Sequence, residues 1–173
     1  MTLAVRPESG MEIRAAADAD LDGIARAHVA AWRTAFTFLP QWFLELLTPE
    51  AVRSQWTAAV ASPESDLFVA EHGGTAGFLQ VRHGEVMALY VHPDSWSRGV
   101  GSALLDHGEA WIAARGARAA LLWTGRDSVQ SRRFYEQHGW GPTGASQDQV
   151  LAGGVVLHEV EYRKDLSPRS ATS

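Results

Sequence analysis

The chain has 173 residues, of which 46% are hydrophobic, with a formal net charge of −5 and no cysteine. This length suits one well-packed domain, and the lack of cysteine excludes disulfides, thiolate metal sites and a cysteine nucleophile. The acidic balance disfavours a general nucleic-acid binder, and no run of about 18 apolar residues predicts a membrane span. The first residues also lack the apolar segment of a signal peptide, so we expect a cytoplasmic protein.

Composition divides the chain into three parts. We expect a flexible polar leader at residues 1–10, a single folded domain at 11–166 and a disordered tail rich in Ser, Pro, Thr and Arg at 167–173. No repeat or low-complexity tract interrupts the middle part. One hydrophobic core is therefore expected to hold it together.

The first third of the domain is predicted to be mainly helical. After a short strand at 12–15, Asp18 is placed to cap a helix that begins near Ala19, because apolar residues then recur at helical spacing. A short helix is expected at 41–47. Thr48 followed by a proline is a helix start, since the hydroxyl caps free N–H groups and proline fits the first turn, and this helix should run to about Val60.

The remainder alternates strands and helices. Two predicted strands at 67–71 and 76–82 form a hairpin through a Gly-Gly turn, and His83-Gly84 then turns the chain into a third strand at 85–91. The later elements are a helix at 100–114, a strand at 119–123, a helix from Asp127 or Ser128 to about Gln137, and a strand at 155–162. This order predicts an α/β (α+β) fold with a mixed, mostly antiparallel sheet and one parallel step.

The segment between the strand at 85–91 and the helix at 100–114 is the strongest functional signal. Gly99 and Gly101 let an anion approach the backbone, and the helix start offers unpaired N–H groups and a partial positive charge. Strand, glycine-rich turn and helix start together predict a phosphate site. A dinucleotide-binding fingerprint is excluded, because Leu104 occupies the position of its third glycine. A P-loop is excluded by the absence of its lysine, and a hydrolase nucleophile elbow by the absence of Gly-x-Ser-x-Gly.

The glycine-rich turn contains Arg-Gly-x-Gly-Ser at 98–102, which follows Leu-Tyr-Val at 89–91. These residues resemble the cofactor-binding signature of the GCN5-related N-acetyltransferase (GNAT) superfamily. A second segment, Ser-Val-Gln-Ser-Arg-Arg-Phe-Tyr-Glu-Gln-His-Gly-Trp at 128–140, is similar to the family's Asn-x-x-Ala-x-x-Phe-Tyr-x-x-x-Gly-Phe. Two departures stand out: Trp96 replaces the usual Gln or Arg, and Ser128 and Ser131 replace the Asn and Ala.

The resemblance implies a GNAT fold, with about six or seven strands and about four helices, and acetyl-CoA as co-substrate without a metal. It implies a pyrophosphate on the backbone N–H groups of residues 98–102 and a pantetheine arm along the strand at 89–91. The candidate cofactor-binding residues are Leu89, Tyr90, Val91, Arg98, Gly99, Val100, Gly101, Ser102, Ser128 and Ser131.

Two residues are candidates for the proton movements of acetyl transfer. Tyr135 shares a helix face with Ser128 and Ser131, and the resemblance implies that its phenol protonates the departing thiolate. Glu85 begins a strand on which residues 85, 87, 89 and 91 are expected to share a face, and it is the candidate base. A packed core aromatic and a solvated turn residue are the structural alternatives for these two positions.

The candidate acceptor site is an aromatic cluster that follows the first helix. Trp32 and Phe36 present ring faces that attract cations, and Arg33 is a candidate ligand for a substrate carboxylate. A packed core is the alternative for the rings, and the sequence leaves both open.

Together these features predict an acetyl-CoA-dependent N-acetyltransferase that acts directly on a primary amine. A small molecule is preferred over a protein N-terminus or a lysine. A non-catalytic acyl-CoA-binding module and an unrelated nucleotide-binding domain are the rival hypotheses. The expected partners are a small-molecule or peptide amine and, from the resemblance, a second copy in a homodimer, without nucleic acid or membrane.

Overall fold

The computed structural model describes residues 10–167, so the leader and tail predicted from the sequence fall, except at their inner ends, outside the described residues. The described part forms seven strands and five α-helices, with three short 3₁₀ turns at Asp18–Asp20, Pro93–Ser95 and Ala152–Gly154. In chain order the main elements are β1 (Glu12–Ala15), α1 (Leu21–Ala35), α2 (Gln41–Leu46), α3 (Pro49–Ala61), β2 (Asp66–Glu71), β3 (Thr75–Arg82), β4 (Glu85–Val91), α4 (Val100–Ala114), β5 (Ala119–Gly125), α5 (Val129–Gln137), β6 (Gly141–Val150) and β7 (Val156–Asp165).

All seven strands belong to one sheet, in the order β1-β2-β3-β4-β5-β7-β6. Every neighbouring pair is antiparallel except β4 and β5, which are parallel. The predicted mixed, mostly antiparallel sheet with one parallel step is therefore confirmed.

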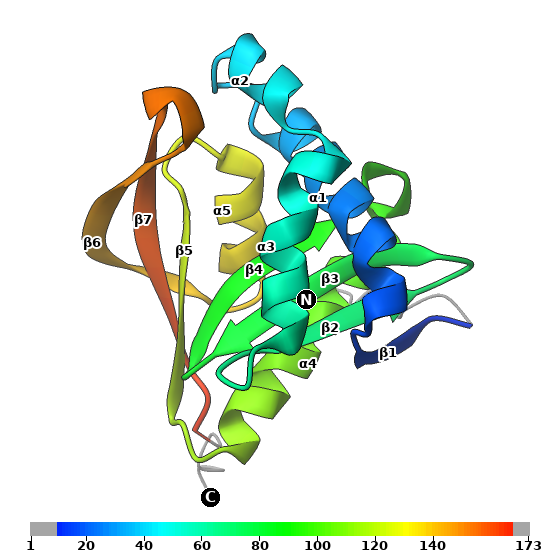
Figure 1. Ribbon diagram of the computed structural model, residues 1–173. Helices are drawn as coiled ribbons and strands as arrows, with labels where there is room; N and C mark the ends of the chain where they lie inside the picture. Colours follow the sequence, from blue (N-terminus) through cyan, green and yellow to red (C-terminus); the bar gives the residue numbers. More distant parts are fainter. Residues whose placement is uncertain (1–9, 168–173) are drawn as a thin grey trace, which may run out of the picture.

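Helices cover both faces of the sheet (Figure 1). Helices α1 and α3 pack on one face through a cluster that includes Ile24, Trp56 and Phe78, and α4 packs on the other through Leu104, Leu105 and neighbouring strand residues. A third, aromatic-rich cluster joins the end of α1 to α2 and the start of β7; its buried members are Trp32, Phe36, Leu39, Phe43, Leu44, Val155 and Leu157. The core therefore extends into the region where the sequence predicts an acceptor site.

The two predicted helix starts had different outcomes. Thr48 caps α3 as predicted, because its Oγ1 accepts a hydrogen bond from the Ala51 N–H at 3.2 Å. The Asp18 cap is wrong: Asp18 lies in a 3₁₀ turn, and the Asp20 carboxylate instead accepts from the Ala17 N–H and from the Arg14 guanidinium. The ion pair with Arg14 makes Asp20 the better anchor for the entry to α1.

Strand β6 was not predicted from the sequence. It contains Pro142 and Gly144, nearly all its side chains are exposed, and its pairing with β7 shifts between Pro142 and Ser146. An edge strand without a buried face has no apolar alternation to detect. Only its pairing with β7 fixes its conformation.

Strand β4 contains a bulge that changes which side chains share a face. Val81 pairs with Val86 and Gln80 with Ala88, so Met87 is an extra residue on β4. Val86 consequently packs in the cluster under α4, whereas Ala88 packs in the cluster under α1 and α3. The predicted common face of residues 85, 87, 89 and 91 is therefore wrong, because an extra residue reverses the alternation along a strand.

Strands β4 and β5 pair only where β4 begins. Glu85 pairs with Leu121 and Val86 with Leu122, and beyond this point the two strands diverge, as Figure 1 shows. The edge of β4 from Met87 to Val91 that would face β5 therefore has no strand partner. This opening in the sheet positions the candidate site.

No helix among residues 10–167 is long and apolar enough to cross a bilayer.

Candidate active site

A large pocket occupies the opening between β4 and β5 and continues onto both faces of the sheet. Its volume is about 2070 Å³, well above the 300–1,000 Å³ of a site for one drug-sized ligand. One end is lined by α4 and α5, and the other by α1, α2, β6 and β7. We name these the cradle end and the acceptor end.

The cradle end is built on the start of α4. Gly99 adopts φ 79°, a conformation that favours glycine, and its carbonyl accepts the first helical hydrogen bond, from the Ala103 N–H at 3.0 Å. The N–H groups of Val100, Gly101 and Ser102 are therefore left without helical partners. Together with the helix dipole, they form an anion-binding site.

A side chain at position 101 would contact Phe134 and Val91 behind the cradle. A Cβ on Gly101 would lie 3.4 Å from two ring atoms of Phe134 and 3.6 Å from Cγ2 of Val91. These are ordinary van der Waals distances, so a methyl group would fit, whereas a branched side chain would extend into the pocket. Gly101 therefore keeps the backbone accessible.

Two polar contacts fix the loop and the helix start. Ser102 Oγ lies 2.8 Å from Nε2 of His138, whose Nδ1 lies 2.7 Å from the Phe134 carbonyl oxygen. A carbonyl can only accept, so we assign the histidine proton to Nδ1, and Nε2 accepts from the Ser102 hydroxyl. The indole N–H of Trp96 donates to the Val91 carbonyl at 2.8 Å, so this departure from the family motif ties the loop to the end of β4.

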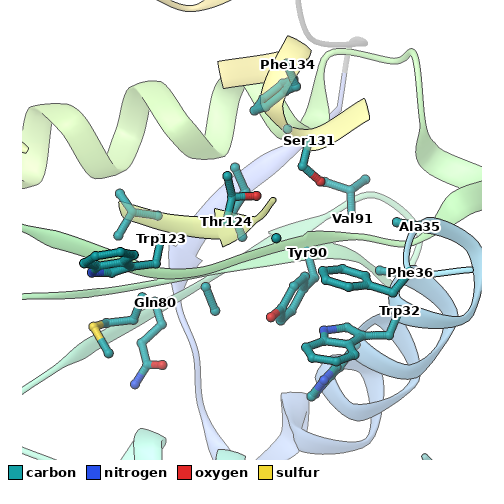
Figure 2. Close-up of a pocket in the computed structure, with 18 of the residues that line it drawn as sticks. Trp32, Ala35, Phe36, Gln80, Tyr90, Val91, Trp123, Thr124, Ser131 and Phe134 are labelled. Carbon is teal, nitrogen blue, oxygen red and sulfur yellow. The ribbon is translucent and has the colours of Figure 1, made fainter. Parts of the chain in front are cut away.

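The side chains of β4 face the two ends of the pocket alternately. Leu89 and Val91 pack toward the α4 cluster, and Tyr90 packs toward α1. In Figure 2, Tyr90 lies on the same side of the strand as Trp32 and Phe36, and Ser131 and Phe134 lie on the other. The free edge of β4 runs between the two ends.

Helix α5 contributes Ser131 and Tyr135 to the pocket. Ser128 is 2% exposed and does not line it; its hydroxyl donates to Ser131 Oγ at 2.8 Å. The Tyr135 hydroxyl makes no hydrogen bond with any described residue, and burial raises the pKa of this phenol above its ordinary value. Tyr135 therefore stays protonated at neutral pH and can donate a hydrogen bond into the pocket.

The acceptor end has an aromatic wall. The Trp32 and Phe36 rings stack with centroids 4.4 Å apart, and His28 stacks on Tyr90 at 5.0 Å. His28 Nδ1 accepts from the Trp56 indole N–H at 3.0 Å, and burial lowers the pKa of His28 to about 4. The imidazole is therefore neutral at pH 7, with its proton on Nε2.

The Trp32 indole N–H and the Tyr90 hydroxyl are two further polar groups of this wall. The buried indole Nε1 of Trp32 has no hydrogen-bond partner among the described residues, although it lies beside the Tyr90 hydroxyl (Figure 2). Burial raises the pKa of Tyr90 to about 12, the charge of Glu159 adds to the rise, and the Trp32 indole opposes it. Tyr90 is thus a neutral phenol at pH 7, and its hydroxyl proton can be donated to a ligand.

The acceptor end is acidic. Burial raises the pKa of Glu85, the charges of Glu161 and Glu159 add to the rise, and Arg82 opposes it. Glu85 and Glu159 both line the pocket, and Arg133 at the cradle end is the one arginine or lysine among the described lining residues. This end therefore suits a cation.

Most of the candidate residues predicted from the sequence meet in this pocket. Arg33 does not, because its guanidinium donates to the backbone carbonyls of Leu44, Glu45 and Leu47 and joins α1 to α2. Ser128 lies behind Ser131, and Arg98 is not among the lining residues. Glu159 and Gln147 were missed, because the predicted strand at 155–162 was not assigned a buried face and no strand was predicted at β6.

Among residues 10–167, no group of three histidine or carboxylate side chains is arranged to hold a metal ion.

Comparison with protein families gives one match. The model of the acetyltransferase (GNAT) family matches residues 27–140, which include the cradle and α5. Two curated relatives are uncharacterized N-acetyltransferases: one from Archaeoglobus fulgidus, 27% identical over 72% of this chain and 89% of its own length, and YuaI from Bacillus subtilis, 28% identical over 86% and 89%.

Solved structures share the fold. A GCN5-related N-acetyltransferase from Rhodopseudomonas palustris superposes with a TM-score of 0.78 at 22% identity, covering 91% of this chain and 96% of that one. The PaiA N-acetyltransferase of Thermoplasma acidophilum, solved with coenzyme A, gives a TM-score of 0.70 at 16% identity and covers 91% and 99%.

Proposed function

The chain belongs to the acetyltransferase (GNAT) family and is an acetyl-CoA-dependent N-acetyltransferase, and we propose that its acceptor is a primary amine on a small molecule. The observation that carries this proposal is the continuity of the pocket, in which an anion-binding cradle and an acidic, aromatic compartment meet at the free edge of β4. The cradle suits a diphosphate, and the compartment suits an ammonium group.

The residues of the cradle end fit coenzyme A. The free N–H groups of Val100, Gly101 and Ser102 would hold the diphosphate, and the unpaired edge of β4 at Leu89–Val91 would pair with the pantetheine arm as an added strand. When bound, acetyl-CoA supplies the activated acetyl group as a thioester. A backbone N–H on the same edge would then stabilise negative charge on the thioester oxygen.

The acceptor must lose a proton before it can attack. An alkyl ammonium group has a pKa near 10.4, so it has no free lone pair at neutral pH. Glu85 is the proposed proton acceptor, because its raised pKa brings it closer to that of the amine. Since Glu85 stands four residues before Leu89 on β4, a bridging water is the proposed route for the proton.

Tyr135 is proposed to act at the sulfur. Its hydroxyl has no hydrogen-bond partner among residues 10–167, and it stays protonated. An ordinary thiol has a pKa near 8.5, below that of this phenol, so complete proton transfer from Tyr135 to a free thiolate would be uphill. A hydrogen bond that stabilises the departing thiolate is the role its chemistry favours.

A small-molecule acceptor is favoured over a protein because α1 and α2 enclose the acceptor end with Trp32, Phe36 and Phe43. The test is a panel of primary amines, amino-acid amides and lysine-containing peptides, with release of the coenzyme A thiol as the readout. Turnover of small amines alone supports the proposal. Turnover confined to peptides would replace it with a protein acceptor, and acetyl-CoA binding without thiol release would favour a non-catalytic module.

A further inference from the structure

Glu159 occupies a specific place in the acceptor end. On β7 it is paired with Gly125 of β5 on one side and with Gln147 of β6 on the other. Directly paired residues in an antiparallel sheet project to the same face, so all three positions face the aromatic wall. Gln147 Nε2 donates to Glu159 Oε2 at 2.8 Å, and Oε1 has no hydrogen bond with a described residue.

The neighbouring glycine connects this carboxylate to the aromatic wall. A Cβ on Gly125 would lie 3.4–3.5 Å from atoms of Phe36, Phe38 and Leu157. Because Gly125 has no side chain, the position beside Glu159 is filled only by the edge of that wall. A cation bound by Glu159 would therefore lie beside a largely aromatic, apolar surface.

Among the described residues, Glu159 has a hydrogen bond with Gln147 and no ion pair with a cationic side chain. The charge of Glu159 contributes to the raised pKa of both Tyr90 and Glu85, so the three groups lie within electrostatic reach of one another. Carboxylates that interact this way without a bound cation repel each other. A ligand with a positive charge would relieve that repulsion.

The unpaired Trp32 indole is an independent sign that this end is built for a polar ligand. A buried donor without a partner is unfavourable by roughly 1–3 kcal/mol in proteins generally, and most buried polar atoms have a hydrogen-bond partner. It lies beside Tyr90, whose ring forms the floor of the same compartment. The negative charge of Glu159 and the Trp32 indole N–H are therefore both available to a bound ligand.

We infer that Glu159, held by Gln147, binds the ammonium group of the acceptor, and that the acceptors are alkyl amines that carry a positive charge at neutral pH. This inference rests on the proposed function. Glu159 positions the amine at the edge of β4, whereas Glu85 lies nearer the start of that strand.

Glu161 provides a matched control. It lies two residues further along β7, its charge also raises the pKa of Glu85, and it accepts a hydrogen bond from Thr143 at 2.7 Å, but it does not line the pocket. Glu161→Gln thus removes a comparable charge near Glu85 without removing a ligand contact. Glu159→Gln keeps an oxygen that can accept from Gln147.

The experiment compares wild type, Glu159→Gln and Glu161→Gln with the best alkyl amine of the panel and with the uncharged hydrazide of the same carbon skeleton. Glu159→Gln should raise KM for the alkyl amine at least tenfold and change KM for the hydrazide less than about threefold, since only the amine brings a charge. Glu161→Gln should leave both KM values near those of wild type.

Three results would overturn the inference: an unchanged KM for the amine in Glu159→Gln, equal losses with both acceptors, or the same loss in Glu161→Gln. Quenching of tryptophan fluorescence by the amine, measured with coenzyme A present, gives a binding constant without turnover. If wild type turns over no amine, the proposed function fails, and a tenfold weaker binding in Glu159→Gln would still support the inference. Far-ultraviolet circular dichroism checks that both variants fold.

Discussion

The cradle end and the acceptor end of the pocket are built in different ways. The cradle is made from backbone groups of one short segment, residues 91–102, whose glycines and helix start determine its chemistry. The acceptor end is made from side chains on several separate elements, among them α1, α2, β4, β6 and β7. A local, backbone-built site suits a constant ligand, and a site assembled from distant side chains can change its ligand without disturbing the first.

The strongest way to test this division is to fill the cradle. The Cβ of Gly101→Val would already contact Phe134 at 3.4 Å. Its two methyl groups would therefore extend into the cradle. We expect kcat/KM for acetyl-CoA to fall about 100-fold, equivalent to about 2.7 kcal/mol. The factor should be the same with every acceptor. Gly141→Val, where a Cβ would meet no atom within 4 Å, is the control. A loss that depended on the acceptor would contradict the division.

The next test concerns the junction of the two ends. Tyr135→Phe removes the hydroxyl but keeps the ring, so kcat should fall about 50-fold, within the range for a hydrogen bond to a charged group. Calorimetry should give an unchanged Kd for acetyl-CoA, because the cradle does not use this hydroxyl. A weakened Kd that accounted for the whole loss would assign Tyr135 to cofactor binding instead.

Acid should destabilise the acceptor end through His28. Its pKa is about 4 in the folded chain and about 6.5 when unfolded, so between these values the unfolded chain binds more protons and stability falls as the pH falls. The expected loss of unfolding free energy from pH 7 to pH 5 is about 2 kcal/mol. Urea unfolding should show a smaller loss in His28→Gln, which can still accept from Trp56. Equal losses in both proteins would exclude His28 as the cause.

The smallest expected effect comes from a side chain in the cradle. Ser102→Ala removes the hydroxyl that His138 orients but leaves the backbone N–H in place. Binding of acetyl-CoA should weaken only about fivefold, as for one ordinary hydrogen bond. Thr57→Ala, on the exposed face of α3, should have no effect. A loss as large as that of Gly101→Val would mean that side chains, not backbone, hold the diphosphate.

The sequence predicted the parts of the molecule whose signals are local. The strand at Glu85–Val91, the helix at Val100–Ala114 and the Thr48 cap were predicted with their observed bounds or contacts, because glycines, caps and apolar periodicity act over a few residues. Strand β6 and Glu159 were missed. Their places depend on pairing with partners distant in the chain, and an exposed edge strand leaves no periodic signal.

Arg33 shows why residue type alone was insufficient at the acceptor end. An arginine next to an aromatic cluster suited a carboxylate ligand, but three backbone carbonyls at the end of α2 occupy its guanidinium. The open carbonyls of a short helix are invisible until its end is placed in space. Arg33 therefore has a structural role and does not reach the pocket.

The bulge at Met87 reverses the alternation of side chains along β4. Beyond Met87 the alternation is reversed, so that Tyr90 faces the acceptor end of the pocket and Leu89 and Val91 face the cradle end. Deleting Met87 would restore a single alternation along the strand and exchange the faces on which Leu89, Tyr90 and Val91 lie, although none of these three residues had been changed. Which side chains of β4 face each end of the pocket thus depends on the number of residues in the strand as well as on their identity.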